Sequence, residues 1–355
     1  AAFHLKVKPW AFFPGGALSL MPRGKRMTAH VYIEGFKGPR YTRMQPLPKG
    51  GYAGLSTPFL GLNFLGLGGF KKKTVQAGPL KVRHLFASPP PFDLGELTGH
   101  HKGALSYLHK VMGAPKHRSM DVYWFPLDMK KRTLSGASGN RSLVVNFLTS
   151  LDGSAPKVPP CRKALRLMAL LHEQFHQLTA QAPLWLVESL AQYYAIKSLK
   201  ESGAISSSVF KTLLEKMTSK APRGVRLVDL QRMYEKTKDR RFYAGFYTLG
   251  VAYWHQIDGL LKTVSKGRYD LDRFVLPLLR ISYGTHGRPL FLFWKLMGRA
   301  GGPKALALSR RYLYAKAPAP RTGPKTEARK PEGNDNEQKI KKEAKGNTGQ
   351  KKRRD

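Results

Sequence analysis

The chain has 355 residues and is strongly basic, with 62 lysines and arginines against 22 aspartates and glutamates and a net charge of +40. Hydrophobic residues make up 41% of it, which is enough for a sizeable core and excludes a wholly disordered protein. The sequence has no long run of uncharged apolar residues, so we expect no transmembrane segment. Cys161 is the only cysteine, which excludes an internal disulfide and a thiolate metal cluster.

The first part of the chain, residues 1–90, is predicted to be β-rich. Short alternating or β-branched runs between Gly-Gly and Pro-Gly pairs predict strands at His4–Val7, Thr28–Ile33 and Thr74–Phe86. The segment Phe59–Phe70 is apolar but rich in glycine, which indicates a loop or a strand.

The sequence pattern changes from mixed to helical along the rest of the chain. A helical period runs from about residue 93 to 113, and two strand-like runs follow at Met120–Pro126 and Ser142–Leu148. After Pro159 and Pro160 the apolar spacing predicts helices, which cover Cys161–Thr179, Leu184–Leu199, Ser207–Met217, Leu227–Lys236, Phe242–Val264, Leu271–Ile281 and Leu290–Met297.

These patterns predict an α+β fold in three segments. Residues 1–90 form a β-rich region, residues 91–314 a second domain with a mostly helical C-terminal half, and residues 315–355 a disordered basic tail. The last forty residues carry only +7 of the net charge, which leaves +33 on the preceding 315. The positive charge therefore belongs mainly to the folded body, and it favours acidic substrates, polyanions or anionic surfaces as partners.

The stretch Leu171–His176 contains the motif H-E-x-x-H. His172 and His176 are four residues apart, so a helix places them one turn apart on one face, where two imidazoles can bind one metal ion. Glu173 lies between them, where a carboxylate can take a proton from a metal-bound water. Exposed histidines on a surface helix are the simpler alternative, but the largely apolar residues 164–171 indicate that this helix is embedded.

A catalytic zinc ion also needs a third protein ligand. Ala182 stands where a metzincin would have its third histidine, and Thr179 where it would have glycine, which excludes that class. The next acidic residue is Glu188. If the chain reverses near Pro183, Glu188 lies level with His176 on the following helix, which makes it the predicted third ligand. A solvated glutamate near a helix N-terminus is the alternative interpretation.

Several segments in order along the chain resemble the gluzincin aminopeptidases. Leu184–Tyr194 resembles their L-W-L-N-E-G-F-A-x-Y stretch, and Tyr247–Gly250 is similar to their Y-x-K-G. Gly267–Phe274 looks like their G-x-x-S-L-D-D-F, and Gly136–Asn140 stands where they have G-A-M-E-N. The resemblance implies that residues 91–314 form a thermolysin-like catalytic domain.

The resemblance also implies roles for individual residues. The two motif histidines and Glu188 would hold one Zn²⁺ per chain, with Glu173 as general base. Tyr247 would donate a hydrogen bond to the oxyanion, and Tyr243, one helical turn earlier, is the alternative. Gly136 and Ala137 would bind the substrate, unless this segment is a plain loop.

The sequence departs from the family pattern at two important points. Eleven residues separate His176 from Glu188, fewer than in the aminopeptidases. Gly139 replaces the glutamate that grips the free amino terminus of the family's substrates. Hydrolysis of peptide bonds by a zinc metallopeptidase is therefore the predicted function, with endopeptidase or aminopeptidase action left open.

The other hypothesis is a basic protein that binds a polyanion or the cell envelope on a degenerate peptidase scaffold. Retention of His172, Glu173, His176, Glu188 and Tyr247 together argues against it, since a site without chemistry does not need all five. The sequence has no zinc finger, RNP-like aromatic motif or recognition-helix signature, so we expect no specific nucleic-acid binding.

The expected partner is a peptide or protein substrate, preferably acidic, with contact to an anionic surface as a further expectation. The chain begins Ala1-Ala2-Phe3, as a mature chain does after signal cleavage, which predicts a secreted or periplasmic location.

Overall fold

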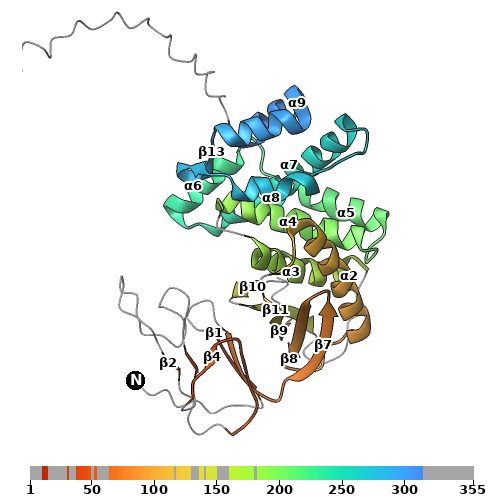
Figure 1. Cartoon of the computed structure of the whole chain (residues 1–355), viewed down its shortest axis with the longest axis vertical. Helices are drawn as coiled ribbons and strands as arrows, with labels where there is room; N and C mark the ends of the chain where they lie inside the picture. The colour runs from red at the N-terminus through yellow and green to blue at the C-terminus, as the bar shows by residue number, and fades with distance from the viewer. Residues whose placement is uncertain are drawn as a thin grey trace, which may run out of the picture. The chain divides into compact units, whose positions relative to one another are not determined.

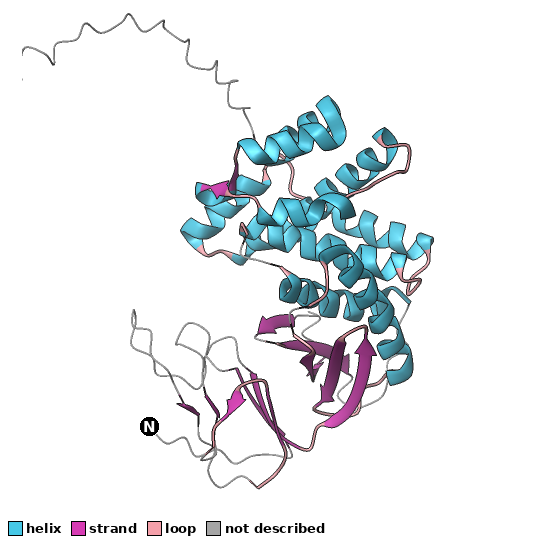
Figure 2. Cartoon of the chain, in the orientation of Figure 1, coloured by secondary structure: helices cyan, strands magenta, loops and turns pink. Residues whose placement is uncertain are grey.

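The structure is a computed structural model that describes residues 10–14, 30–31, 37–48, 52–53, 64–115, 117–128, 136–139, 141–149, 160–179 and 182–314. Strands precede residue 150 and helices dominate after residue 160, which confirms the expected α+β class (Figure 2). The predicted strand His4–Val7 and the predicted disordered tail 315–355 lie outside the described residues. So does most of Thr28–Ile33, of which only His30–Val31 is described.

A five-stranded sheet lies beneath the helices in the view of Figure 1. Its strands are ordered β10-β11-β9-β8-β7, and β9 runs parallel to both of its neighbours, whereas β7 and β10 pair antiparallel. The bounds are β7 Lys71–Ala77, β8 Leu80–Phe86, β9 Ser119–Asp128, β10 Gly136–Gly139 and β11 Ser142–Thr149. The sheet therefore takes strands from both sides of residue 90, where the sequence predicted a boundary.

Shorter strands complete the β structure. They form a β1-β6-β3 sheet, a β2-β5-β4 sheet and a β12-β13 hairpin. Their bounds are β1 Trp10–Pro14, β2 His30–Val31, β3 Arg40–Thr42, β4 Gln45–Pro46, β5 Tyr52–Ala53, β6 Phe64–Gly68, β12 Tyr283–Gly284 and β13 Arg288–Pro289.

The helices pack around α4, Leu184–Glu201, which is buried over most of its circumference. A helix buried in this way belongs to the core, and its buried polar residues need partners there. Helices α3 and α7 both pack against it. The other helices are α2 Leu94–Met112, α3 Pro160–Leu178, α5 Ser207–Thr218, α6 Leu227–Thr237, α7 Arg240–Val264, α8 Asp272–Arg280 and α9 Phe291–Leu313, with the short 3₁₀ helix η3 at Thr285–Gly287.

Three predicted elements differ from the structure. The run Thr74–Phe86 is a hairpin of two strands that turns at Gly78, rather than one strand. The helix predicted at Leu290–Met297 continues to Leu313 across a kink at Gly302 and Pro303, because tertiary packing extends it beyond the local pattern. The Gly/Ser loop considered at Gly136–Asn140 is strand β10 from Gly136 to Gly139. Among the described residues, no helix is long and apolar enough to cross a membrane.

Candidate metal centre

Two consecutive helices bring His172, His176 and Glu188 together. Helix α3 ends at Leu178 and α4 begins at Leu184, where Pro183 is the N-cap residue and its carbonyl accepts hydrogen bonds from the first turn. The reversal between the helices places Glu188, in the second turn of α4, against the last two turns of α3. This is the arrangement that the spacing of the three residues predicts.

The three side chains present their ligand atoms to one point. His172 Nε2 lies 3.2 Å from Glu188 Oε2 and 3.2 Å from His176 Nε2, and His176 Nε2 lies 3.6 Å from Glu188 Oε2. A tetrahedral zinc ion with bonds of about 2.0–2.2 Å separates its ligand atoms by roughly 3.3–3.6 Å. The observed triangle therefore fits three ligands of a single tetrahedral ion, and no other such group occurs among the described residues.

The electrostatics of the centre favour a bound cation. Burial opposes the charge of the Glu188 carboxylate, but hydrogen bonds with His172 and His176 outweigh burial and hold its pKa well below the usual range. Burial likewise opposes protonation of His176, yet the carboxylates of Glu188 and Glu173 raise its pKa. The centre thus keeps negative charge in a buried place and attracts positive charge to it.

Glu173 lies beside the centre without being one of its three converging side chains. Burial raises its pKa, and the two histidines partly offset this effect. Strand β10 fixes where its side chain lies, because a Cβ atom at Gly136 would come within 2.6 Å of Glu173 Cγ and 3.0 Å of Oε1. Only glycine at position 136 leaves room for Glu173 in this conformation.

Tyr247 lies over the centre from helix α7. Its ring is 5.3 Å from the ring of His172 between centroids. Gly250 makes this approach possible, because a Cβ atom there would come within 2.1 Å of the Cβ of Ser189, the residue after Glu188. The close crossing of α7 and α4 therefore determines how near Tyr247 lies to His172 and Glu188.

Tyr243 lies at the centre as well. Its ring is 5.6 Å from that of Tyr247. Burial and the charge of Glu188 raise the pKa of both tyrosines, so both hydroxyls keep their protons at neutral pH and can donate hydrogen bonds. The structure brings both sequence candidates to the same place.

Gln177 connects the helix of the two histidines to β10, and the sequence analysis missed it. Its side-chain amide donates hydrogen bonds to Ser138 Oγ and, at 2.6 Å, to the carbonyl of Gly139. These bonds join the residue after His176 to the strand that contains Gly136 and Ala137. Only its place next to a ligand marks it in the sequence, because its partners are almost forty residues away.

A second buried charged cluster also involves α4. The Lys197 ammonium bonds to Asp258 at 3.0 Å, to Asp270 at 3.0 Å and to Asp272 at 2.7 Å. Tyr193 and Tyr194 donate hydrogen bonds to Asp258 and Asp272 respectively. This lysine–aspartate network supplies its own cation, and it accounts for Asp258 as a structural residue rather than a ligand.

Three other histidines lie outside the centre. His101 on α2 is fully buried, and its Nδ1 lies 3.3 Å from Nε2 of His84 on β8. Burial lowers the pKa of His101 to about 4 and that of His84 as well, so both are neutral core residues near pH 7. His255 packs against Tyr193 and Phe210.

Comparison with known proteins finds solved structures with a similar fold, but no protein that is related by sequence. No protein-family model and no curated protein matches the chain. Among solved structures, an aminopeptidase N family protein from Idiomarina loihiensis superposes with a TM-score of 0.71 at 16% identity, over 87% of this chain and 59% of that one. Native yeast LTA4 hydrolase superposes with a TM-score of 0.51 at 14% identity, over 89% of this chain and 52% of that one.

The resemblance to gluzincin aminopeptidases that the motifs predict is therefore confirmed at the level of the fold. The chain spans between half and three fifths of the length of these two proteins. A likeness at this identity leaves activity, substrate and partners to be argued from the residues of this chain.

Proposed function

We propose that this protein is a zinc metallopeptidase that hydrolyses peptide bonds, with one zinc ion per chain bound by His172, His176 and Glu188. The observation that carries the proposal is the convergence of these three ligand atoms within 3.2–3.6 Å of one another, with the buried Glu173 beside them. Residues 91–314, which contain them, are proposed to form the thermolysin-like catalytic domain after the β-rich region of residues 1–90, and strands β7 and β8 of that region complete its five-stranded sheet.

The chemistry divides between the ion and the side chains. When bound, the ion supplies Lewis acidity at the scissile carbonyl and at the attacking water. Glu173 accepts the proton of that water and delivers it to the leaving amine, a role that suits a carboxylate whose pKa is raised by burial. Tyr247 donates a hydrogen bond to the developing oxyanion, and Tyr243 orients the Tyr247 hydroxyl.

The substrate is proposed to lie along β10, with Gly136 and Ala137 as binding residues. Among the described strands β10 is at one edge of the five-stranded sheet, and Gly136 lies against Glu173. An extended peptide can pair with such an edge through backbone hydrogen bonds. Gly139 offers no carboxylate to a free amino terminus, so we expect N-acetylated and free peptides to be cleaved at similar rates. Cleavage of free peptides alone, one residue at a time, would contradict this expectation and indicate aminopeptidase action.

A preference for acidic peptides is proposed from the net charge of +40. Such a field raises the rate of encounter with anionic substrates, and salt screens it. A peptide library digested at low and high ionic strength tests this, and equal use of acidic and neutral peptides at low salt would contradict it.

Metal content tests the main proposal. We expect one zinc ion per chain in the wild type and in a His100→Ala control, and strongly weakened binding in His176→Ala and Glu188→Ala. Peptide hydrolysis should follow metal content and return when zinc is restored to the chelated wild type. A wild-type protein that binds no zinc at neutral pH would contradict the proposal, and binding of polyanions by a degenerate scaffold would become the leading hypothesis.

A further inference from the structure

Three consecutive apolar side chains, Leu290, Phe291 and Leu292, are exposed where α9 begins. Their exposed fractions are 42%, 73% and 51%, and the only other exposed large hydrophobic side chain among the described residues is Val264 at 41%. Single exposed apolar residues are ordinary, but adjacent ones form a patch that commonly marks an interaction site. We call these three residues the apolar triplet.

The core fixes the start of α9 with the apolar triplet on its outer side. Phe293, the next residue, is fully buried and packs edge-on against Trp185 of α4, with ring centroids 6.5 Å apart. Trp185 Nε1 also donates a hydrogen bond of 2.9 Å to the carbonyl of Gly287, three residues before the triplet. In Figure 1, α9 lies at the end of the helical half that is farther from the five-stranded sheet. The triplet therefore faces away from the body of the protein.

Basic side chains continue the same face of α9. Residues four apart lie on one face of a helix, so Lys295 and Arg299 follow Phe291 along the first turns of α9. Both basic side chains are exposed, and the Lys295 ammonium lies 5.8 Å from the centre of the Phe291 ring. The face thus combines exposed apolar groups with positive charges.

The carboxylates of the helices packed against α9 do not offset this charge. Residues 273–314 include eight lysines and arginines, all exposed, and no aspartate or glutamate. The neighbouring helices α6, α7 and α8 contain four acidic residues, each paired with a basic side chain: Asp229 with Arg232, Glu235 with His286, Asp258 with Lys197 and Lys262, and Asp272 with Lys197. An anionic partner would therefore meet positive charge around the apolar triplet.

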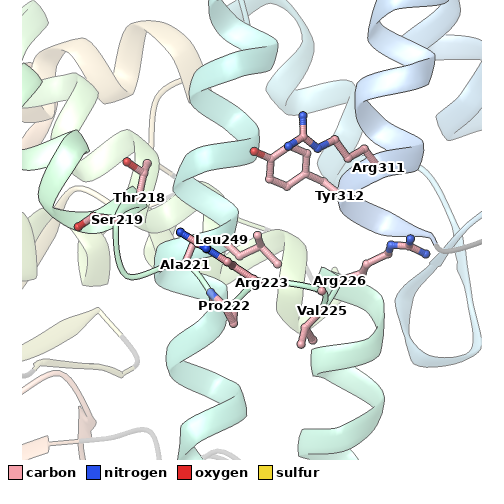
Figure 3. A pocket seen from close by; sticks show the side chains of 11 residues that line it. Thr218, Ser219, Ala221, Pro222, Arg223, Val225, Arg226, Leu249, Arg311 and Tyr312 are labelled. Atoms are coloured by element: carbon pink, nitrogen blue, oxygen red, sulfur yellow. The ribbon is translucent and has the colours of Figure 1, made fainter.

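The last turns of α9 belong to a different part of the surface. A kink at Gly302 and Pro303 separates them from the first turns. Figure 3 shows Arg311 and Tyr312 beside a cavity of about 490 Å³, which the α5–α6 connection and Leu249 of α7 also line. Arg311 is thus an exposed cation on the same helix but away from the apolar triplet, which makes it a matched control for Lys295.

We propose that the apolar triplet, Lys295 and Arg299 form a surface that docks on an anionic lipid bilayer. The triplet would enter the interface, and the two cations would lie at the phosphates of the headgroups. A bilayer has an apolar interior directly beneath an anionic surface, which matches apolar side chains flanked by cations. The long stems of lysine and arginine keep their charges at the headgroups while neighbouring apolar groups insert. A second copy of the chain would bring two positive faces together, which disfavours it as the partner.

Co-sedimentation of the full chain with vesicles tests this surface. The vesicles are phosphatidylcholine with or without phosphatidylglycerol, and we expect binding only where phosphatidylglycerol is present. Phe291→Ser should weaken binding by about tenfold or more, because it removes apolar burial in the bilayer without changing the net charge. Lys295→Gln should weaken it by about fivefold, the contribution of one basic residue near an anionic surface. Arg311→Gln changes the net charge equally and should bind almost as the wild type does.

Four results would overturn the proposal. Failure of the wild type to bind the mixed vesicles would do so directly. Equal binding by the wild type and Phe291→Ser would mean attraction to the net charge alone, once circular dichroism has shown that both are folded. Self-association that Phe291→Ser abolishes, without vesicle binding, would indicate a second copy of the chain. Binding of polyglutamate that Phe291→Ser weakens, again without vesicle binding, would indicate an acidic protein. Vesicle binding requires neither zinc nor hydrolysis, so this surface can be supported even if the proposed peptidase activity is absent.

Discussion

Helix α4 contributes residues to two buried polar clusters. One contains both positive and negative side chains, and the other has a carboxylate and two histidines but no lysine or arginine. Glu188 in the second turn of α4 joins two histidines in a group that includes no lysine or arginine, whereas Lys197 lies among three aspartates. Both groups are buried, with the Lys197 side chain only 2% exposed and that of Glu188 8% exposed. The cluster that contains its own cation can be complete as a structural element, while the cluster without one is suited to bind a metal ion.

This comparison predicts that charge removal has opposite consequences in the two places. For Glu173, beside the metal centre, it should affect chemistry and leave stability intact. In the lysine–aspartate network it should affect stability and leave the metal bound.

Glu173→Gln is expected to have the largest effect, a loss of about 10²- to 10⁴-fold in kcat, because the general base is removed. Zinc content should not change. The free energy of unfolding should stay equal or rise, because burial already disfavours the charge of Glu173. Steady-state kinetics and urea unfolding on the same samples measure both quantities. A large loss of stability would show that Glu173 is a structural residue.

Lys197→Met should cost about 3–5 kcal/mol of stability, because it removes the one buried cation that contacts all three carboxylates and leaves only the partly exposed Lys262 beside Asp258 and Asp270. Lys211→Met is the matched control, since that lysine is 78% exposed and lies 3.9 Å from Glu215, and we expect a change within about 0.5 kcal/mol. Denaturant unfolding measures both variants. Loss of zinc from folded Lys197→Met protein would contradict the expectation that the lysine–aspartate network affects stability and leaves metal binding unchanged.

Gly136→Ala should lower kcat by about 10²-fold, because the new Cβ atom displaces Glu173 from beside the metal. Zinc content should stay at the wild-type value. Gly99→Ala on α2, where a Cβ meets nothing within 4 Å, is the control and should be fully active. An active Gly136→Ala enzyme would mean that Glu173 functions from another position.

The smallest effect is a pH dependence of the Lys197→Met destabilisation. Burial opposes the charges of the Asp258 carboxylate and the Lys197 ammonium. The attraction between them outweighs burial, so Lys197 lowers the pKa of Asp258 and the aspartates raise the pKa of Lys197. The carboxylate contribution is therefore present above the usual aspartate pKa and lost as pH falls through the lowered value. The lysine contribution is present below its usual pKa and lost as pH rises through the raised one. The destabilisation should be largest from neutral to mildly alkaline pH and smaller near pH 3, as measured by urea unfolding. A pH-independent difference would contradict this account.

Local sequence patterns predicted much of the helical half. The helices that contain His176, Glu188 and Tyr247 begin and end within about two residues of their predicted bounds, because apolar periodicity and Pro183 are local signals. The strand pairing was not predictable in the same way. Thr74–Phe86 has one continuous strand-like composition, and only its pairing showed a hairpin.

The sequence by itself determined the ligand types, their spacing on two helices and the basic charge, since each of these depends on residues close together in the chain. Tertiary structure alone decided the contact of Gly136 with Glu173, the bonds of Gln177 to β10, the partners of Lys197 and the bond of Trp185 to Gly287 before α9. These features join residues that are tens of positions apart. Their contacts are set by how the helices and strands pack, which no local pattern records.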